Sequence, residues 1–382
     1  MTPKIKKQRQ PKVAIVHDRL NVRGGGERVL EEIAALFPRA PIYTLIYEPS
    51  LFADSEIGKH AVRTSFIQRL PKAASHHRYY IPLMPLAVEG FDLSRFDIII
   101  SSSAAFAHGV RTTPRQLHIS YIHSPMRYAW HQYQQHVARS GVGSPFIRLL
   151  LAYLRRWDRG ASQSADWLLA NSAWTTQLIR KAFHRQAEVL YPPVHTEWFK
   201  PAAQRDDYYL AVSRLVPYKR VDLIVGAFSK LGRPLVVVGE GPEGKKIRSL
   251  AKGNIRILGY QPRQAIIDLM QKAKAFVHAA EEDFGIAAVE AQAAGLPVLA
   301  YGHGGLTETV VEGRTGLFFR EQTEESLMGA VIEFEAHGHF NARASQKNAE
   351  RFSVDKFKSG LAAFVDQKWH SFLGSTQFQS EI

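Results

Sequence analysis

Residues 273–302, AKAFVHAAEEDFGIAAVEAQAAGLPVLAYG, contain a clear strand–helix–strand pattern. The apolar runs at the two ends, AKAFVHAA and LPVLAYG, have the length and composition of buried strands. Between them we expect a helix from about Gly285 to Ala294, with Gly295 in the C-terminal cap and Pro297 ending the helix. A strand, a helix and a second strand in this order are typical of a parallel sheet.

The same alternation extends through both halves of the chain. The other strand candidates are KVAIVHD, FDIIISSS and LHISYIH in the first half, and YYLAVSRL, RPLVVVGEG and IRILGY in the second. Helical patterns occupy residues 28–36, 221–231 and 263–274. Two such series predict an α/β fold with two doubly wound, Rossmann-like domains. In such folds ligands bind at the carboxyl ends of the strands, so we expect a site in a central cleft between the halves.

The proline-rich segment 191–203, YPPVHTEWFKPAA, separates the two series. We therefore predict an N-terminal domain over residues 1–195, a linker over 196–203 and a C-terminal domain over 204–355. Residues 356–382 are expected to form a helix that packs back toward the N-terminal domain.

The positive charge of the chain is concentrated in its first half. The net charge is +14, and residues 1–200 contain 27 Lys and Arg against 14 Asp and Glu, whereas residues 201–382 contain 22 against 21. This asymmetry indicates an anionic partner: a membrane surface, a phosphorylated substrate or a nucleic acid. The absence of cysteine excludes disulfides and thiolate metal sites. No signal peptide or membrane-spanning run is recognisable, so a cytoplasmic protein is expected.

Two glutamates in the opening segment, Glu282 and Glu290, are the first candidates for a binding site. Glu290 has small and apolar neighbours one helical turn away on both sides, and a buried carboxylate costs several kcal/mol unless it has a partner. The two neighbouring hydroxyls of a ribose would suit it. Glu282 lies at the carboxyl end of the preceding strand, where substrates bind. The alternative is that Glu290 pairs with an internal Lys or Arg and that Glu282 is merely solvated.

Several further groups could bind phosphate or sugar. The backbone N–H groups around Phe284, Gly285 and Ile286 open the predicted helix and favour a phosphate. In SRLVPYKRVD, Arg214 and Lys219 follow a strand and could clamp a diphosphate, or they could be ordinary surface charges.

Two features of the first half have similar alternatives. In RGGGERV, glycines after the first strand allow close approach of a ligand, or form a plain tight turn. In YIHSPMRY, His123 is either catalytic or a hydrogen-bonded structural histidine.

Three patterns have competing interpretations. The tripeptide Asp283-Phe284-Gly285 lacks the other kinase motifs and is accidental. VVVGEGPEG matches a dinucleotide fingerprint, but the acid expected about 20 residues later is missing, so a loop against another nucleotide is favoured. Residues 144–159 form an amphipathic helix that could lie on an anionic membrane or pack into the core. Its apolar face comprises Phe146, Leu150, Tyr153, Leu154 and Trp157, and its basic face Arg148, Arg155, Arg156 and Arg159.

These elements, in this order, resemble the retaining glycosyltransferases of family four (glycosyltransferase group 1), whose fold is called GT-B. The resemblance covers nearly the whole chain. It rests on Glu282 and Glu290, which have seven residues between them and are followed by AQAAGLPVLA, and on SRLVPYKRVD and HGGLTETVVEGRTGLFF. HSPMRYAW and YPPVHTEWF are most similar to bacterial mannosyl- and rhamnosyltransferases that build surface polysaccharide.

The resemblance implies a role for each candidate residue. Glu282 would bind hydroxyls of the donor sugar, and Glu290 the ribose of the nucleotide. Arg214 and Lys219 would hold the diphosphate, and His123 would lie beside the transferred sugar. The backbone would contribute through Gly24, Gly25 and Gly285, with Gly304 and Gly305 near the donor.

The function implied is a retaining α-glycosyltransferase, a hexosyltransferase. Its C-terminal domain would bind a GDP- or UDP-linked sugar, with GDP-mannose as the first guess, and its N-terminal domain a lipid-linked saccharide. No metal or cofactor is expected, and the protein would associate with the anionic inner face of the cytoplasmic membrane. One alternative is a GT-B-type sugar-nucleotide epimerase. The other is a nucleic-acid-binding protein, suggested by the pI of about 9.8, although no nucleic-acid motif accompanies the charge.

Overall fold

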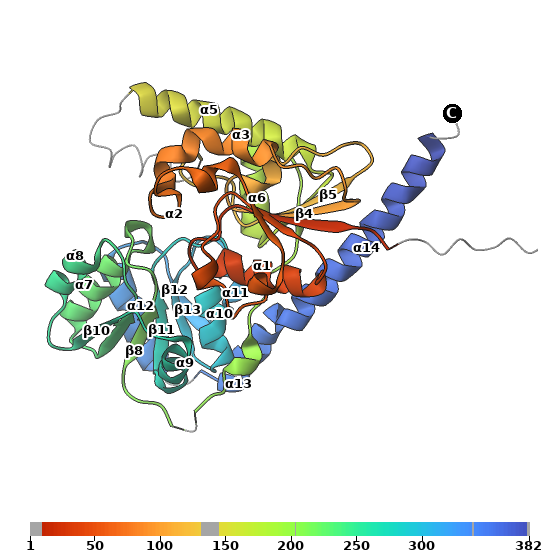
Figure 1. Ribbon diagram of the computed structural model, residues 1–382. Coiled ribbons are helices and arrows are strands. Elements are labelled where there is room, and N and C mark those ends of the chain that lie inside the picture. Colours follow the sequence, from red (N-terminus) through yellow and green to blue (C-terminus); the bar gives the residue numbers. More distant parts are fainter. Residues whose placement is uncertain (1–9, 131–144, 203, 338–339, 380–382) are drawn as a thin grey trace, which may run out of the picture. The chain divides into compact units, whose positions relative to one another are not determined.

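The computed structural model describes residues 10–130, 145–202, 204–337 and 340–379, and these residues form two compact units (Figure 1). The basic N-terminal residues 1–9 lie outside the described part. Unit 1 comprises Met1–Asn171, Thr175–Leu190 and Lys358–Ile382, and unit 2 comprises Ser172–Trp174 and Tyr191–Phe357. No helix in the described part has the length and apolar character needed to cross a membrane.

Unit 1 is built on a parallel sheet of seven strands in the order β3-β2-β1-β4-β5-β6-β7. The strands are β1 Val13–His17, β2 Ile42–Thr44, β3 Val62–Thr64, β4 Ile98–Ser103, β5 Leu117–Ile122, β6 Trp167–Ala170 and β7 Glu188–Val189. The order changes direction between β1 and β4, as in doubly wound folds, and ligands of such folds bind near this point. The predicted strands KVAIVHD, FDIIISSS and LHISYIH are β1, β4 and β5.

Helices of unit 1 pack on this sheet through apolar faces. They are α1 Gly25–Leu36, α2 Ala73–His76, α3 Met84–Glu89, α5 Pro145–Ala161 and α6 Ala173–Phe183, together with α14 Val354–Gln379 from Lys358 onward. Short 3₁₀ segments include η4 His77–Leu83 and η5 Ala107–Gly109. The core on one side of the sheet joins β1 and β4 to α3 and α5, with Met84, Leu151 and Leu154 buried in it. The helix predicted over residues 28–36 begins earlier, at Gly25.

Unit 2 contains a second parallel sheet, in the order β10-β9-β8-β11-β12-β13. Its strands are β8 Tyr209–Val212, β9 Leu235–Val238, β10 Ile255–Gly259, β11 Ala275–His278, β12 Val298–Tyr301 and β13 Gly316–Phe319. Its helices are α7 Val221–Leu231, α8 Gly244–Leu250, α9 Arg263–Lys272, α10 Ile286–Ala293, α11 Leu306–Thr309, α12 Glu324–His337 and α13 Ala342–Ala349. Residues 273–302 thus form β11, α10 and β12, as the sequence predicts.

The proline-rich segment belongs to unit 2, whereas the sequence analysis places a linker over residues 196–203. Val194 and Phe199 are buried in the unit 2 core, and the Val194 N–H donates to the Phe352 carbonyl at 2.8 Å. The Tyr191 ring packs edge-on against Phe352. Because its side chains bury apolar surface, this segment is part of the packed unit and the boundary falls earlier, between Leu190 and Tyr191.

The last helix, α14, joins unit 1 from Lys358 onward. Lys358 Nζ forms an ion pair with Glu32 on α1 at 2.6 Å, and Lys368 Nζ forms one with Glu188 of β7 at 3.1 Å. These contacts place the C-terminal helix on unit 1.

Candidate functional site

Glu282 is the centre of a polar cluster at the carboxyl end of β11. Its side chain is only 8% exposed. Its Oε1 accepts a hydrogen bond from Lys219 Nζ, at the end of η8 (Pro217–Lys219), and lies 2.9 Å from Nε2 of His278, the last residue of β11. The structure therefore rejects the alternative that Glu282 is merely solvated. It brings together Glu282 and Lys219, which the sequence analysis singled out, and adds His278, which that analysis missed.

Two glycines fix the backbone that carries Glu282. The Gly305 N–H donates to the Glu282 carbonyl at 2.7 Å, and Glu282 and Gly304 form an isolated parallel bridge. A Cβ at Gly304 would lie 2.5 Å from the Glu282 carbonyl oxygen, and one at Gly305 2.2 Å from that of Asp283. A side chain at either position would displace the loop, so both glycines are required for the position of Glu282.

Helix α10 begins directly after this loop. Gly285 precedes it in a left-handed conformation, with φ of +93°, and Ile286 is its first residue. Phe284 is buried against the rings of Tyr191 and Phe352, which anchors the helix start in the unit 2 core. The first backbone N–H groups of α10 have no acceptor in the preceding helical turn and are suited to an anion.

Glu290 is buried on α10, as the apolar pattern of the helix predicts, with 8% of its surface exposed. Arg263 Nη1, at the start of α9, lies 3.6 Å from Glu290 Oε1, and the Arg263 guanidinium stacks over the Trp198 ring at 4.6 Å. The structure thus contains the cationic neighbour that the sequence analysis weighed as an alternative to a ribose. Arg263 itself was not predicted, because nothing in the sequence near Arg263 indicates that α9 starts opposite α10.

The remaining predicted cation, Arg214, is exposed at the end of β8. The backbone around it contacts the glycines of VVVGEGPEG: a Cβ at Gly239 would lie 1.8 Å from the Ser213 carbonyl oxygen, and one at Gly241 2.3 Å from that of Leu215. These glycines are needed for close packing of two loops, which is a structural reason for the pattern that resembles a dinucleotide fingerprint.

A second polar cluster lies in unit 1, where four side chains connect α1 to the end of β5. Glu27 Oε1 lies 3.7 Å from His17 Nε2; His17 Nδ1 is 3.2 Å from Ser102 Oγ, and Ser102 Oγ is 2.8 Å from His123 Nε2. Burial raises the pKa of Glu27, but the hydrogen bond and charge of His17 outweigh it and lower that pKa overall. Glu27 also accepts from the Gly24 N–H at 2.8 Å, which closes the first turn of α1.

This chain of contacts holds the ring of His123. Ser102 Oγ lies between Nδ1 of His17 and Nε2 of His123, and the tautomers of the two rings decide in which of these contacts it donates. The Asn171 amide donates to the His123 carbonyl at 2.9 Å and holds its backbone. At the start of α1 the Gly24 N–H is taken by Glu27, and Gly25 presents a further backbone N–H group in the same unit.

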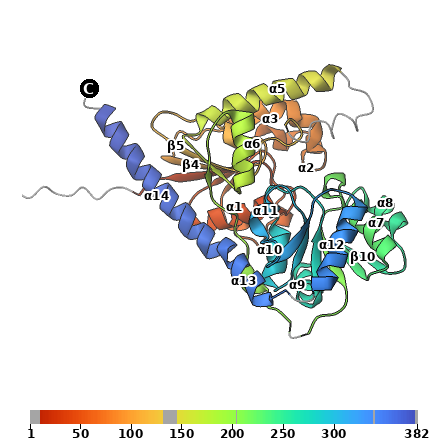
Figure 2. The same ribbon diagram turned by 180° about the vertical axis from the view of Figure 1, so that it is seen from behind.

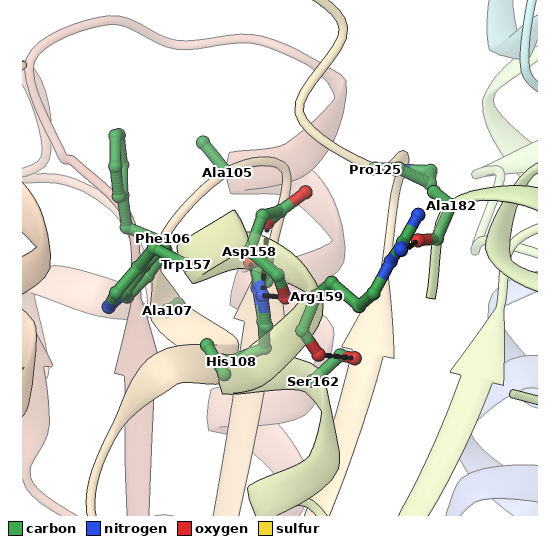
Figure 3. Close-up of polar contacts among 12 residues, drawn as sticks. Ala105, Phe106, Ala107, His108, Pro125, Trp157, Asp158, Arg159, Ser162 and Ala182 are labelled. Atoms are coloured by element: carbon green, nitrogen blue, oxygen red, sulfur yellow. Dashed lines mark hydrogen bonds and ion pairs between the residues drawn. The ribbon is translucent and has the colours of Figure 1, made fainter. Parts of the chain in front are cut away.

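A third network in unit 1 centres on the buried side chains of His108 and Asp158 (Figure 3). His108 Nδ1 is 2.9 Å from Ser103 Oγ, and its Nε2 is 3.1 Å from Asp158 Oδ1. The indole N–H of Trp130 donates to Asp158 Oδ2 at 2.6 Å. Burial would lower the pKa of His108, but its hydrogen bond to Asp158 and the charge of Asp158 outweigh this and raise it. All three residues of this Ser–His–Asp arrangement are closed off from solvent, so its role is to tie α5 to the segment after β4.

The sequence matches two families along most of its length. Residues 23–198 match the profile described as Glycosyltransferase Family 4, and residues 196–351 match Glycosyl transferases group 1. The chain belongs to these glycosyltransferases.

Curated relatives of this glycosyltransferase are similar over part of their length. An uncharacterized glycosyltransferase of Methanocaldococcus jannaschii is 25% identical over 221 residues, which cover 56% of this chain and 63% of the relative. A D-inositol 3-phosphate glycosyltransferase of Mycobacterium avium is 28% identical over 229 residues, which cover 52% of this chain and 54% of the relative. The chain therefore matches between about half and two thirds of the length of these relatives.

Solved structures share the fold over nearly the full chain. HepE of Anabaena, in complex with UDP and glucose, aligns with a TM-score of 0.70 at 19% identity, covering 93% of this chain and 99% of HepE. Sucrose-phosphate synthase of Thermosynechococcus elongatus aligns with a TM-score of 0.73 at 16% identity, covering 94% of this chain and all of the synthase. The predicted GT-B fold, with two doubly wound domains, is confirmed.

Proposed function

We propose that this protein transfers a sugar from a nucleotide-sugar donor to an acceptor hydroxyl with retention of anomeric configuration. The observation that carries the proposal is the pair of buried glutamates in unit 2, Glu282 after β11 and Glu290 on α10, each with a cationic neighbour. The family match and the similarity to a D-inositol 3-phosphate glycosyltransferase support this reaction class.

In the proposed complex the two carboxylates bind two parts of the donor, the ribose and the sugar. Glu290 accepts hydrogen bonds from the ribose hydroxyls, and the neighbouring Arg263 orients its carboxylate. Glu282 accepts from hydroxyls of the donor sugar while His278 holds its Oε1. His123, whose Nε2 lies 2.8 Å from Ser102 Oγ, contacts the transferred sugar.

Cations and backbone N–H groups bind the diphosphate. Arg214, exposed just after β8, supplies a planar pair of donors, and the ammonium of Lys219, which also donates to Glu282, supplies a point charge. The N–H groups at Phe284, Gly285 and Ile286 complete the set, with a further donor at Gly25, whereas the Gly24 N–H donates to Glu27. Gly304 and Gly305 keep the loop that carries Glu282 close to the donor.

The reaction breaks the bond between the anomeric carbon and the diphosphate oxygen. Negative charge develops on the departing diphosphate and positive character on the sugar ring. Preorganised donors on the leaving group stabilise this change, and the loss of one such donor typically costs about 3–4 kcal/mol. The acceptor hydroxyl attacks from the face that the diphosphate leaves, and no metal is required in this scheme.

For the substrates we propose GDP-mannose as donor, with UDP-linked sugars as the alternative, and a lipid-linked saccharide as acceptor. The mannosyltransferase-like segments HSPMRYAW and YPPVHTEWF favour mannose, and the basic first half of the chain favours an acceptor at the anionic inner face of the cytoplasmic membrane.

The test is a transfer assay with GDP-mannose, UDP-glucose and a lipid-linked saccharide, with the product linkage determined by NMR. An α-linked product formed from an α-linked donor supports the proposal. Conversion of the sugar nucleotide to its epimer without any acceptor would instead show an epimerase. Absence of both reactions in folded protein, for every donor of the panel, would contradict the proposed function.

A further inference from the structure

Six large apolar side chains are exposed on adjacent elements of unit 1. Between 41% and 79% of each is accessible, and they are Tyr79 and Leu83 on η4, Leu86 on α3, and Phe146, Leu149 and Tyr153 on α5. Elements α3 and α5 lie side by side in both views of the molecule (Figures 1 and 2), and their inner faces share one core. We call these six residues the apolar row.

Helix α5 cannot rotate to bury its exposed apolar side chains, because its opposite face is already packed against the core. Leu151 and Leu154 are buried in the core, and Asp158 contacts the buried His108. The Trp157 indole N–H donates to Glu89, at the end of α3, at 2.6 Å. Positions 146, 149 and 153 lie along one flank of the helix, away from Leu151, Leu154 and Asp158, and Trp157 borders this flank one turn after Tyr153.

The face predicted from the sequence is therefore split in the structure. Leu154 packs in the core, whereas Phe146 and Tyr153 are exposed, so neither a wholly buried nor a wholly exposed apolar stripe describes α5. The predicted first residue of this helix, Ser144, lies outside the described residues.

The charge around the apolar row is of one sign. Residues 57–88 contain five Lys or Arg and no Asp or Glu, and residues 98–157 contain seven Arg and no acid. The exposed cations on the described parts of these segments include Arg69, Lys72, Arg78, Arg148 and Arg156. The acid at the end of α3, Glu89, is neutralised by Arg111 at 2.6 Å.

We propose that the apolar row and its cations dock unit 1 onto an anionic lipid bilayer, with α5 lying along the membrane surface. Apolar tips enter the boundary between headgroups and acyl chains, tyrosines suit the interface, and arginines pair with lipid phosphates. A second copy of the chain would bring like charges together, which disfavours self-association through this face. The inference rests on the proposed function, since a lipid-linked acceptor is presented at such a surface.

The test compares binding to sedimented vesicles of phosphatidylcholine with and without phosphatidylglycerol. The wild-type protein should bind the anionic vesicles, and the triple variant Leu86→Ser/Phe146→Ser/Leu149→Ser should bind at least about tenfold more weakly, because it loses inserted apolar area. Ile332→Ser, which changes an apolar residue 58% exposed on α12 of unit 2, is the matched control and should bind like the wild type.

Charge is tested separately with Arg148→Gln/Arg156→Gln. This variant should bind less at low salt, and the difference should shrink as salt screens the lipid charge. The inference would be overturned if the wild-type protein did not bind anionic vesicles, or if the triple variant bound them as tightly as the wild type. A wild-type dimer that the triple variant converts to a monomer, seen by light scattering, would assign the face to a second copy and also overturn it.

Failure of this inference is distinguishable from failure of the proposed function. Nucleoside-diphosphate binding, measured by calorimetry, and transfer to a detergent-dispersed acceptor should be unchanged in both variants. If vesicle binding is absent but transfer persists, only the docking surface is wrong. If transfer is absent in every protein while vesicle binding follows the expected order, only the proposed reaction is wrong.

Discussion

At the scale of single residues, Glu282 lies where three charges or potential charges meet. Lys219 and His278 both contact its Oε1, so the carboxylate organises a cation and an imidazole as well as offering an acceptor to a sugar. We predict that Glu282→Ala lowers kcat by at least about 100-fold, because hydrogen bonds to reacting groups have effects of this size. The measurement is the initial rate of transfer, with calorimetric binding of the nucleoside diphosphate as evidence that unit 2 is folded. Wild-type kcat in folded Glu282→Ala would refute the role of this residue.

Ser102 provides a second prediction at this scale. It joins His17 to His123, and without its hydroxyl the His123 ring loses a hydrogen-bond partner at Nε2. Ser102→Ala should lower kcat/KM by roughly tenfold, as expected for a hydrogen bond worth about 1–2 kcal/mol, and should shift the pH profile of kcat/KM. Ser120→Ala removes another buried hydroxyl, one bonded to Ser101, and should leave the pH profile unchanged. Equal profiles for the two variants would reduce Ser102 to a structural role.

At the scale of elements, the predictable parts were those with local signals. Strands β1, β4, β5 and β8–β12 were recognised from apolar runs. The four-residue strands β6 and β13 were missed, and β2, β3 and β7 have only two or three residues and carry no pattern of their own. The contact of His17 with Ser102 arises because these residues are register partners in β1 and β4, 85 positions apart. Arg263 reaches Glu290 from another helix for the same reason: tertiary packing, and not sequence spacing, brings them together.

Helix α1 allows a stability prediction for a single element. Gly26 lies in its first turn, and an added Cβ would have only ordinary contacts, 3.7 Å from His123 and 3.8 Å from His17. Gly26→Ala should raise the free energy of unfolding of unit 1 by about 0.5–1 kcal/mol, because alanine loses less backbone entropy in a helix. Gly305→Ala, whose Cβ would collide with the Asp283 carbonyl, should lower stability instead. Chemical denaturation of both variants tests the signs, and a stabilising Gly305→Ala would contradict the loop geometry.

At the scale of the whole molecule, buried histidines set the pH dependence of stability. Burial lowers the pKa of His118 to about 3, and burial followed by the charge of Arg19 lowers that of His77 to about 4. Below pH 6.5, the ordinary pKa of histidine, these two histidines become protonated in the unfolded chain but stay neutral in the folded protein until their lower pKa values are reached. The free energy of unfolding therefore falls as the pH drops. His108 has the opposite effect, because its pKa is raised in the folded protein. Its contribution to the free energy of unfolding is complete below pH 6.5 and is lost as the pH rises through its pKa in the folded protein.

We therefore expect maximal thermal stability near pH 6.5. Melting temperatures measured across the pH range should fall on both sides of this value. His118→Gln should reduce the fall in melting temperature below pH 6.5, and His108→Gln should reduce the fall above it. A melting temperature that rises steadily with pH in the wild-type protein would contradict the assignment of these protonation states.

The central claim is that the segment from β11 to α10 binds a nucleotide sugar through Glu290 and the ribose. Calorimetric titration of wild type and Glu290→Ala with GDP, UDP and their 2′,3′-dideoxy analogues tests it most directly. We predict that the wild type binds the preferred ribonucleotide at least about tenfold more tightly than its dideoxy analogue, a difference of about 1.4 kcal/mol, and that Glu290→Ala abolishes this preference. Equal discrimination by wild type and variant, or no binding of any nucleoside diphosphate by folded protein, would contradict the claim.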